Sequence, residues 1–500
     1  MAGPVDVSPA VRSTADVGAL GARDRGVTGV LLAAGLCLGT AVLSLGAAGP
    51  MQLAFPLVAV LAALWLLVSR RPHAYLALTL SLWLVAPLVR RIVDWQSSYH
   101  EFSVITATPA LVSLLAVPWV LGARRRLHRD VAVLFGVVGV VLTYAFAVGV
   151  LRNGLVAAAA DAPLIIAPFM LGLFVLTVPE DSDRVRALLP ALAAYGAIVL
   201  GGYAVVQFLV MPPWDAEWMV DSGVGNLGRP EPGEARAFGT LGTASYLGQV
   251  LAAMLLVVVA ERRVPLQLLA LGTGLAGLGV TQSRQGWLVL VVGVVVLLVL
   301  GRVRVWRLVG IGAGLFVVLA ALGSPVVEQV SDRIEETRTE GAYDDSLMAR
   351  YAFQTAVAPQ VLGDFDGAGL GATGRAALVS GGSHLTTPQY VSFDSGVFES
   401  LVRYGSVAGL VLLGTLAAVG VSVTIRSRRG TLLDAVVAAG IIAMTFGMLF
   451  QDTQRGVFGV MLWTLLAVAG RVPGQVTAGR AATALRADPR PRTSPVPPGR

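Results

Sequence analysis

The stretch GLAGLGVTQSRQGWLVLVVGVVVLLVL, residues 274–300, places two long apolar runs on either side of a short polar gap. A helix needs about 20 mostly apolar residues to cross the hydrocarbon core of a bilayer. Runs of this kind recur along the chain, which has 500 residues, is 55% hydrophobic and 13% charged, and has a mean hydropathy of +0.75. Soluble domains carry roughly 25% charged residues. The pattern therefore predicts an all-α integral membrane protein.

The apolar runs are separated by gaps that carry arginine, and together they predict about 12–14 transmembrane helices. Short runs such as 74–89 leave the exact number open. The expected spans are 27–47, 52–69, 74–89, 107–121, 131–150, 154–177, 187–211, 239–260, 264–281, 286–301, 308–324, 397–424, 431–450 and 457–470.

The arginines indicate how the chain crosses the membrane. If the N-terminus is cytoplasmic, alternate gaps become cytoplasmic, and these gaps hold clusters such as Arg70-Arg71, Arg124-Arg125-Arg126 and Arg262-Arg263. Positive charge favours the cytoplasmic side. We therefore expect a multi-pass protein of the cytoplasmic membrane with both termini in the cytoplasm. The net charge of +7 does not indicate a nucleic-acid partner, because the arginines are scattered through short loops.

This topology divides the chain into five parts. We expect a cytoplasmic N-terminal segment, a transmembrane helical bundle, one long extracytoplasmic loop, a set of C-terminal transmembrane helices and a disordered cytoplasmic tail. The tail is rich in Pro and Arg and has too few apolar residues for a core. The boundaries are 1–26, 27–324, 325–396, 397–470 and 471–500.

Several arginines fall on the expected outer side, against the charge rule, and as a set they suggest an anionic ligand there. They are Arg90, Arg91, Arg152, Arg229, Arg236, Arg284, Arg350, Arg375 and Arg455. Taken singly, each is also explained as a solvated side chain at the lipid interface.

Arg284 gives the clearest indication of an anion site. Ser283 is placed to cap a helix that starts near Gly286, and the unpaired N–H groups of a first helical turn attract anions. Arg284 adds a full positive charge beside them. The turn is therefore a candidate site for phosphate or diphosphate. Arg236, just before the expected span 239–260, repeats the arrangement.

Other polar residues have weaker or double interpretations. Asp394, where the long loop re-enters the membrane, is an expected N-cap, and it is also able to orient or deprotonate an acceptor hydroxyl. Trp214 and Trp218 are expected interface anchors that could also stack on a sugar. The DFD sequence at 364–366 has the form of a metal-binding motif but is more typical of a turn. We expect no metal site and no cofactor.

Five motifs in their order along the chain resemble the O-antigen ligase and O-antigen polymerase superfamily of bacterial membrane glycosyltransferases. TQSRQGW heads a span, and a hairpin and a long outer loop follow it. The loop contains an arginine-led helix and a Gly-rich turn, and it ends at Asp394. The motifs are RRIVDWQ (90–96), RAFGTLGTASYLGQ (236–249), TQSRQGW (281–287), SLMARYAFQTAV (346–357) and GDFDGAGLGATG (363–374).

The resemblance implies a function in cell-surface polysaccharide biosynthesis. A glycan would move from a polyprenyl-diphosphate carrier to a glycan or lipid acceptor at the outer face of the cytoplasmic membrane. Arg284 and Arg350, assisted by Arg236 and Ser283, would bind the diphosphate, and Asp394 would act on the acceptor. A polysaccharide chain-length regulator is a further partner that the resemblance admits. The family's ligases have His-Asn where this chain has Asp394-Ser395, which favours a polymerase.

Two other functions stay open. A transporter or flippase of lipid-linked oligosaccharides would need ionisable residues near the bilayer midplane, and the expected span centres are nearly free of them. A non-catalytic envelope protein would tolerate substitution of Arg284, Arg350 and Asp394 together.

Overall fold

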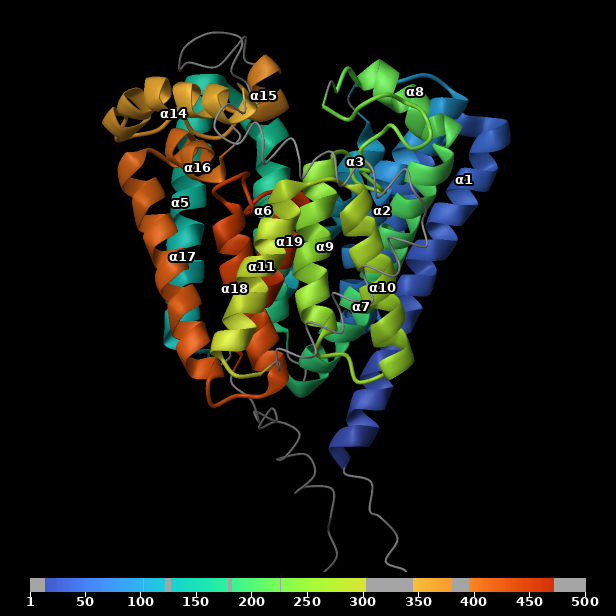
Figure 1. Ribbon diagram of the computed structural model, residues 1–500, viewed down its shortest axis with the longest axis horizontal. Helices are drawn as coiled ribbons and strands as arrows, with labels where there is room; N and C mark the ends of the chain where they lie inside the picture. The colour runs from blue at the N-terminus through green and yellow to red at the C-terminus, as the bar shows by residue number, and fades with distance from the viewer. Residues whose placement is uncertain are drawn as a thin grey trace, which may run out of the picture.

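The computed structural model describes residues 14–101, 103–121, 127–178, 182–224, 226–302, 345–379 and 395–471. This part of the chain is a bundle of helices (Figure 1). Its β pairing consists of two isolated bridges, Leu127 with Arg471 and Gly228 with Ala235. The helices are α1 (Thr14–Val68), α2 (Pro72–Gln96), α3 (Val104–Leu114), α4 (Val117–Leu121), α5 (Arg129–Asn153), α6 (Leu155–Thr177), α7 (Ser182–Val210), α8 (Pro213–Ser222), α9 (Ala244–Val258), α10 (Val264–Val280), α11 (Arg284–Val299), α14 (Asp345–Gly363), α15 (Gly374–Val379), α16 (Gly396–Tyr404), α17 (Ser406–Ser427), α18 (Leu432–Gly447) and α19 (Gly456–Gly470).

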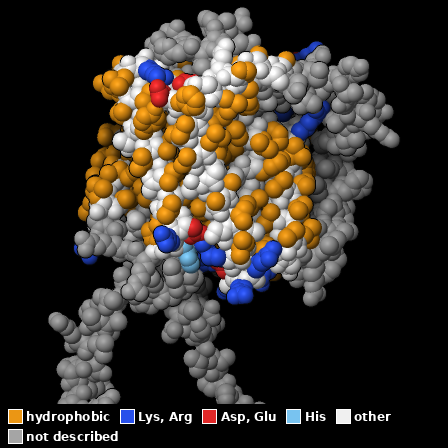
Figure 2. Space-filling model, turned by 90° about the vertical axis from the view of Figure 1, so that its left-hand side faces the viewer, with side chains coloured by type: hydrophobic (Ala, Val, Ile, Leu, Met, Phe, Trp, Pro, Cys, Tyr) orange, Lys and Arg blue, Asp and Glu red, His pale blue; other side chains and the backbone are white. Residues whose placement is uncertain are grey.

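The prediction of an all-α integral membrane protein is confirmed. Among the described residues, 7 helices are long and apolar enough to cross a membrane, and α9, α10, α11, α18 and α19 are shorter apolar helices. The short expected span 74–89 is a full 25-residue helix, α2. Figure 2 shows apolar side chains spread over the flank of the bundle, with charged side chains gathered at its two ends. A lipid-facing flank with polar ends is the pattern of a multi-pass membrane protein.

Helix α1 consists of two antiparallel arms. The backbone leaves helical geometry at Ala47 (φ −153°, ψ 55°). Gly29 in the first arm packs closely on Ala74 near the start of α2. Gln52 in the second arm donates a 2.8 Å hydrogen bond to Asp94 near the end of α2. Because the second arm ends just before α2 begins, it must run back beside the first arm. The two arms correspond to the two expected spans at the N-terminal end.

The expected single span 397–424 is wrong. The chain breaks between α16 and α17 at Gly405, which has φ 82°. A Cβ at this position would lie 2.2 Å from the carbonyl oxygen of Phe365. Glycine is therefore required where the chain turns against the coil that follows α14. The expected span 308–324 lies outside the described residues.

Small residues let the central helices approach one another. Gly201 of α7 and Gly277 of α10 are in direct backbone contact, since a Cβ on Gly277 would lie 2.4 Å from the Cα of Gly201. Gly172 of α6 packs in the same way on Trp463 of α19. Close helix packing through glycine is typical of membrane bundles, where apolar burial alone does not drive association. This packing fixes the scaffold that carries the polar residues at the upper end.

The two ends of the bundle differ in composition. We call the end that carries α8, α14, α15 and α16 the upper face, and the end where α1 begins the lower face (Figure 1). Short loops at the lower face hold Arg70, Arg71, Arg262, Arg263, Arg302, Arg428 and Arg429. Arg302 donates to the carbonyl oxygens of Arg428 and Gly430, at 2.9 and 2.7 Å, and so satisfies acceptors at the end of α17.

Candidate active site

The turn between α10 and α11 lies at the upper face and has the expected cap. Ser283 is buried, and its hydroxyl accepts a 3.3 Å hydrogen bond from the N–H of Gly286. Helix α11 begins at Arg284, whose side chain is exposed. Gln282 has φ 51°, a left-handed conformation that costs free energy in a non-glycine residue. The amides of a first helical turn lack partners within the helix, so the turn presents N–H dipoles and one guanidinium on the same side.

Close packing holds this turn in place. A Cβ on Gly286 would lie 2.7 Å from the carbonyl carbon of Gly248 in α9, and a Cβ on Gly248 would lie 2.8 Å from the Cβ of Ser283. The two glycines therefore bring α9 and α11 into backbone contact exactly beside the turn. Gln249 of α9 also donates a 3.3 Å hydrogen bond to Gln285. These contacts fix the position of the turn relative to α9.

Arg236 lies against the same turn, but from a loop and not from the start of a helix as the sequence predicted. The expected span starting at 239 is wrong at this end, because residues 235–243 form a loop without helix and α9 begins at Ala244 with Thr243 as its N-cap. Arg236 donates instead to the carbonyl oxygens of Thr281 and Gln282, both at 3.4 Å. Arg236 and Arg284 therefore flank the start of α11 together.

A second group of residues fixes the loop that carries Arg236. Arg91 is buried, pairs with Asp215 at 3.0 Å, and donates to the carbonyl oxygens of Gly239 and Leu241. Gln207 accepts hydrogen bonds from the N–H groups of Phe238 and Gly239, at 2.9 and 2.7 Å. Arg91 and Gln207 each bond to backbone groups of the loop, which defines one conformation for it. Arg91, expected as an outward arginine, is thus a structural residue.

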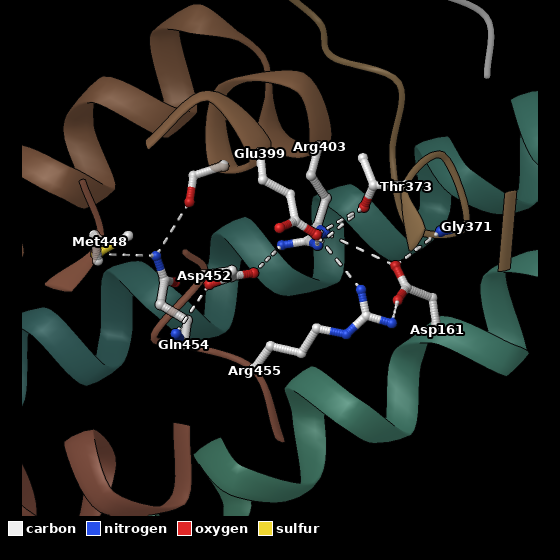
Figure 3. Close-up of polar contacts among 10 residues, drawn as sticks. Asp161, Gly371, Thr373, Glu399, Arg403, Met448, Asp452, Gln454 and Arg455 are labelled. Atoms are coloured by element: carbon white, nitrogen blue, oxygen red, sulfur yellow. Dashed lines mark hydrogen bonds and ion pairs between the residues drawn. The ribbon is translucent and has the colours of Figure 1, made fainter. Parts of the chain in front are cut away.

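A buried group of charged residues lies beneath α16 and close to the start of α19. We call Asp161, Glu399, Arg403, Asp452 and Arg455 the ion cluster (Figure 3). Arg403 has no exposed side-chain surface and contacts Glu399 at 2.6 Å, Asp452 at 2.8 Å and Asp161 at 3.8 Å. Arg455 contacts Asp161 at 2.9 Å and Glu399 at 3.5 Å. Two guanidinium groups thus face three carboxylates.

The ion cluster joins parts of the chain that are distant in sequence. Asp161 comes from α6, Glu399 and Arg403 from α16, and Asp452 and Arg455 from the connection between α18 and α19. The coil after α14 joins them through two contacts: Thr373 donates to Glu399, and the N–H of Gly371 donates to Asp161, both at 3.1 Å. Burying five charges is costly, and such groups are weak evidence for stability alone. The cluster therefore indicates a place where the relative positions of these segments are important.

The residues of the ion cluster differ in pKa and in solvent exposure. Burial raises the pKa of Glu399, the nearby Asp452 and Asp161 add to this, and Arg403 and Arg455 oppose it. The side chain of Arg455 is 19% exposed, whereas that of Arg403 is 0% exposed. Arg455 is thus the guanidinium of the cluster that solvent reaches.

Glycines at the upper face fit the coil 364–374 tightly onto α5, α6 and α16. Gly369 has φ 78°, and its Cβ would lie 2.2 Å from the backbone nitrogen of Gly149. Asn153 donates to the carbonyl oxygens of Ala368 and Leu370, at 2.8 and 2.9 Å. The DFD sequence forms a turn as expected, with Asp364 accepting a hydrogen bond from the N–H of Gly367 at 3.0 Å. The coil is therefore packed directly on the backbone of the neighbouring helices.

The first turns of α9 connect the α10–α11 turn with the region of the ion cluster. Tyr246 packs edge-to-face on Phe458 of α19, with ring centroids 4.9 Å apart. Gln249, which donates a hydrogen bond to Gln285, also packs closely on Gly447 of α18: a Cβ at Gly447 would lie 3.0 Å from its side-chain oxygen. Helix α9 therefore lies between the α10–α11 turn and the ion cluster. Both belong to the upper end of the bundle.

The predicted site residues have different outcomes. Ser283, Arg284 and Arg236 come together. Arg350 lies in α14 at the upper face, but its side chain is outside the described residues, as is Asp394 (Figure 1). The N-cap of α16 is Ser395, which accepts from the N–H of Phe398 at 3.5 Å.

The ion cluster was not predicted as a site from the sequence. Arg455 appeared only among the outward arginines. One signal was present: Asp161 stands alone in an otherwise apolar stretch, LVAAAADAPLIIAPFML, and an acid inside a membrane helix indicates a functional or paired group. The spacing of Glu399 and Arg403, four residues apart on a helix, is the second signal.

Residues 268–413 match the family described as O-antigen ligase. This region of the chain is similar to that family. It contains Ser283, Arg284, Glu399 and Arg403, while Asp161 and Arg455 lie outside it. A search of the curated proteins finds no match. The resemblance seen in the sequence motifs is thus confirmed for this region of the chain.

Proposed function

We propose that this protein transfers a glycan from a polyprenyl-diphosphate carrier to a glycan or lipid acceptor at the outer face of the cytoplasmic membrane. The observation that carries the proposal is the convergence of Arg236 and Arg284 on the capped start of α11. A diphosphate is a dianionic or more highly charged leaving group. Guanidinium groups and helix N-termini are its natural partners, because both present N–H donors with positive charge.

The proposed reaction exchanges one bond to the sugar for another. The acceptor hydroxyl oxygen bonds to the anomeric carbon of the donor sugar, and the bond from that carbon to the diphosphate oxygen breaks. The electron pair leaves with the polyprenyl diphosphate, whose growing charge Arg284, Arg350 and Arg236 stabilise. The hydroxyl proton passes to Asp394, acting as general base. The same positive groups supply the charge that a metal would otherwise supply.

The orientation follows from the distribution of arginine. The lower-face loops hold clusters of positive charge such as Arg70-Arg71 and Arg428-Arg429. Positive charge in short loops favours the cytoplasmic side. In this orientation the upper face is extracytoplasmic, and α1 and α19 have their lower-face ends in the cytoplasm. A chain-length regulator would then reach the enzyme from the membrane or the outer side.

A polymerase is favoured over a ligase in this proposal. The family's ligases have His-Asn where this chain has Asp394-Ser395, so a carboxylate replaces an imidazole as base. The second candidate is a transporter or flippase of lipid-linked oligosaccharides. The buried Asp161 in α6 is the feature that favours it, since transporters place ionisable groups inside their helices.

The test is the lipid-linked glycan pool, measured by mass spectrometry of lipid extracts. We compare cells that lack the protein, cells with Arg284→Ala and cells with Arg229→Ala, an exposed arginine of the upper face that pairs with Glu234. We expect carriers with one repeat unit to accumulate in the first two strains only. An unchanged pool in the Arg284→Ala cells would contradict the role of the turn.

The same extracts separate the two candidate functions. For a flippase, the carrier-linked glycan would be trapped on the cytoplasmic side of spheroplasts, out of reach of an added glycosidase. For the transferase it accumulates on the outer side and is digested. Digestion in cells lacking the protein therefore supports transfer, and protection supports flipping.

A further inference from the structure

One oxygen of the Glu399 carboxylate has no partner within the part of the chain that the structure describes. The other oxygen, Oε1, accepts hydrogen bonds from Arg403 at 2.6 Å and Thr373 at 3.1 Å, and contacts Arg455 at 3.5 Å. No hydrogen bond or ion pair joins Oε2 to another described residue (Figure 3). The side chain is 11% exposed, and Oε2 is not fully buried. Solvent therefore reaches this oxygen.

The other two carboxylates of the ion cluster use both oxygens inside the protein. Asp452 pairs with Arg403 through Oδ2 at 2.8 Å, and its Oδ1 accepts from the N–H of Gln454 at 2.9 Å. Asp161 likewise has a partner for each oxygen, at 2.9 and 3.1 Å. The cluster holds one carboxylate more than it holds guanidinium groups, and the acceptor that is left over is the Oε2 of Glu399.

Three segments of the chain hold the Glu399 carboxylate in place. Arg403 lies four residues further along α16, Arg455 precedes α19, and Thr373 belongs to the coil 364–374. The two guanidinium groups favour the ionised form of the carboxylate, which accepts up to about four hydrogen bonds. An acceptor that is fixed before its ligand arrives loses little entropy on binding. Oε2 is therefore a preorganised acceptor for a ligand with hydrogen-bond donors.

Glu399 and the α10–α11 turn lie on opposite sides of the start of α9. Residues 247–258 of α9 are buried, whereas Tyr246 in its first turn is 43% exposed. The charge of Glu399 acts on the hydroxyl group of Tyr246, while Gly248 packs on Ser283 of the turn. Positions two apart on a helix point about 200° away from each other. The exposed end of α9 therefore separates Glu399 from the proposed diphosphate site.

We propose that Glu399 binds the acceptor glycan, with Oε2 accepting a hydrogen bond from one of its sugar hydroxyl groups. A carboxylate beside the departing diphosphate would repel it, whereas beside the acceptor it forms a charge-assisted hydrogen bond. The position of Glu399 across α9 from the diphosphate site assigns it to the acceptor. Glu399 holds the acceptor in place, and the hydroxyl proton still passes to Asp394. The identity of the ligand rests on the proposed function.

The test measures how the full-length protein in lipid nanodiscs binds a glycan without its carrier. Mild acid releases this glycan from the lipid-linked pool of the host cells, and saturation-transfer NMR gives its Kd. We expect Glu399→Gln to weaken binding about tenfold, because the hydroxyl group loses a charged acceptor. Glu399→Asp keeps the negative charge if the first variant does not fold. Its shorter side chain withdraws the oxygen from the hydroxyl group, so binding should weaken here too.

The matched control is Asp452→Asn. It removes one negative charge from the same cluster and one partner from Arg403, but Asp452 has no free oxygen. We expect Asp452→Asn to bind the released glycan as the unaltered protein does. Equal weakening by Glu399→Gln and Asp452→Asn would mean that Glu399 acts only through the structure of the cluster, and would overturn the proposal. Normal binding by either Glu399 variant, or no binding by the unaltered protein, would overturn it as well.

Arg284→Ala separates this proposal from the proposed function. This variant should bind the released glycan normally, because the glycan lacks a diphosphate. An unchanged carrier pool in Arg284→Ala cells would contradict transfer at the turn and leave glycan binding by Glu399 standing. Turnover with lipid-linked glycan as donor and released glycan as acceptor completes the test. Glu399→Gln should raise the KM for the acceptor only, and a raised KM for the donor alone would overturn the assignment.

Discussion

Arg455 forms a 2.9 Å ion pair with Asp161, and this contact joins the start of α19 to the N-terminal half of α6. Asp161 is fully buried and also accepts the N–H of Gly371. The Gly-rich coil of the long loop is thereby tied to the helical bundle by charge. The pair brings together three segments that are 210 and 84 residues apart along the chain, at 161, 371 and 455.

Substitution of Asp161 is expected to destabilise the protein strongly. Asp161→Asn leaves the buried Arg403 and Arg455 with less negative charge, and breaking a buried pair costs about 3–5 kcal/mol. The control is Asp366→Asn, which removes an ion pair to Arg152 in which the acid is 72% exposed, and exposed pairs contribute about 0–1 kcal/mol. Thermal unfolding in detergent compares the two variants. Equal Tm values would contradict the structural importance of the cluster.

The two functions of Ser283 are separable by a pair of substitutions. Asn and Asp both cap helices well, so Ser283→Asn and Ser283→Asp should keep α11 to a similar extent. Only Asp adds negative charge beside Arg284, which should repel a diphosphate. We expect Ser283→Asp to raise the KM for the lipid-linked donor clearly more than Ser283→Asn does. Thermal stability is measured alongside, and identical KM values would argue against an anion at this turn.

The helical architecture was predictable because lipid requires it. Apolar runs such as those flanking residues 281–286 have to satisfy their backbone groups internally, and a helix does this within one segment. The cap by Ser283 was predictable for a similar reason, since it depends on residues only three positions apart. Local rules of this kind do not depend on the rest of the fold.

The missed features depend on contacts between distant residues. The break at Gly405 follows from the approach of Phe365, which no periodicity signals. Arg236 was expected at the start of a helix, but hydrogen bonds between the loop backbone and the side chains of Arg91 and Gln207 hold its loop in a non-helical form. The ion cluster likewise assembles from α6, α16 and the connection between α18 and α19. Asp161 alone carried a visible signal, because a lone acid in an apolar helix requires a partner.

Glu399 is expected to make stability depend on pH. Burial raises its pKa above the ordinary value of 4.5. A carboxyl whose pKa is raised on folding contributes stability below its unfolded pKa, and this contribution is lost as the pH rises through the folded value. Glu399→Gln stays neutral, so its Tm should fall less than that of the unaltered protein between pH 4 and pH 8. Parallel Tm profiles for the two proteins would show that Glu399 does not titrate in this way.

For the stability of the Gly-rich coil, we expect close packing to contribute more than the positive φ angles of its glycines. Gly369 and Gly301 both have positive φ, 78° and 66°, so alanine meets similar backbone strain at each. A Cβ at Gly369 would lie 2.2 Å from the backbone of Gly149, whereas a Cβ at Gly301 meets nothing within 4 Å. Gly301→Ala should therefore cost about 1–2 kcal/mol, and Gly369→Ala should cost more and displace the coil from α5. Limited proteolysis within residues 364–374 measures this displacement. Equal protection in both variants would mean that the coil is held by Asn153 and the ion cluster without the close fit at Gly369.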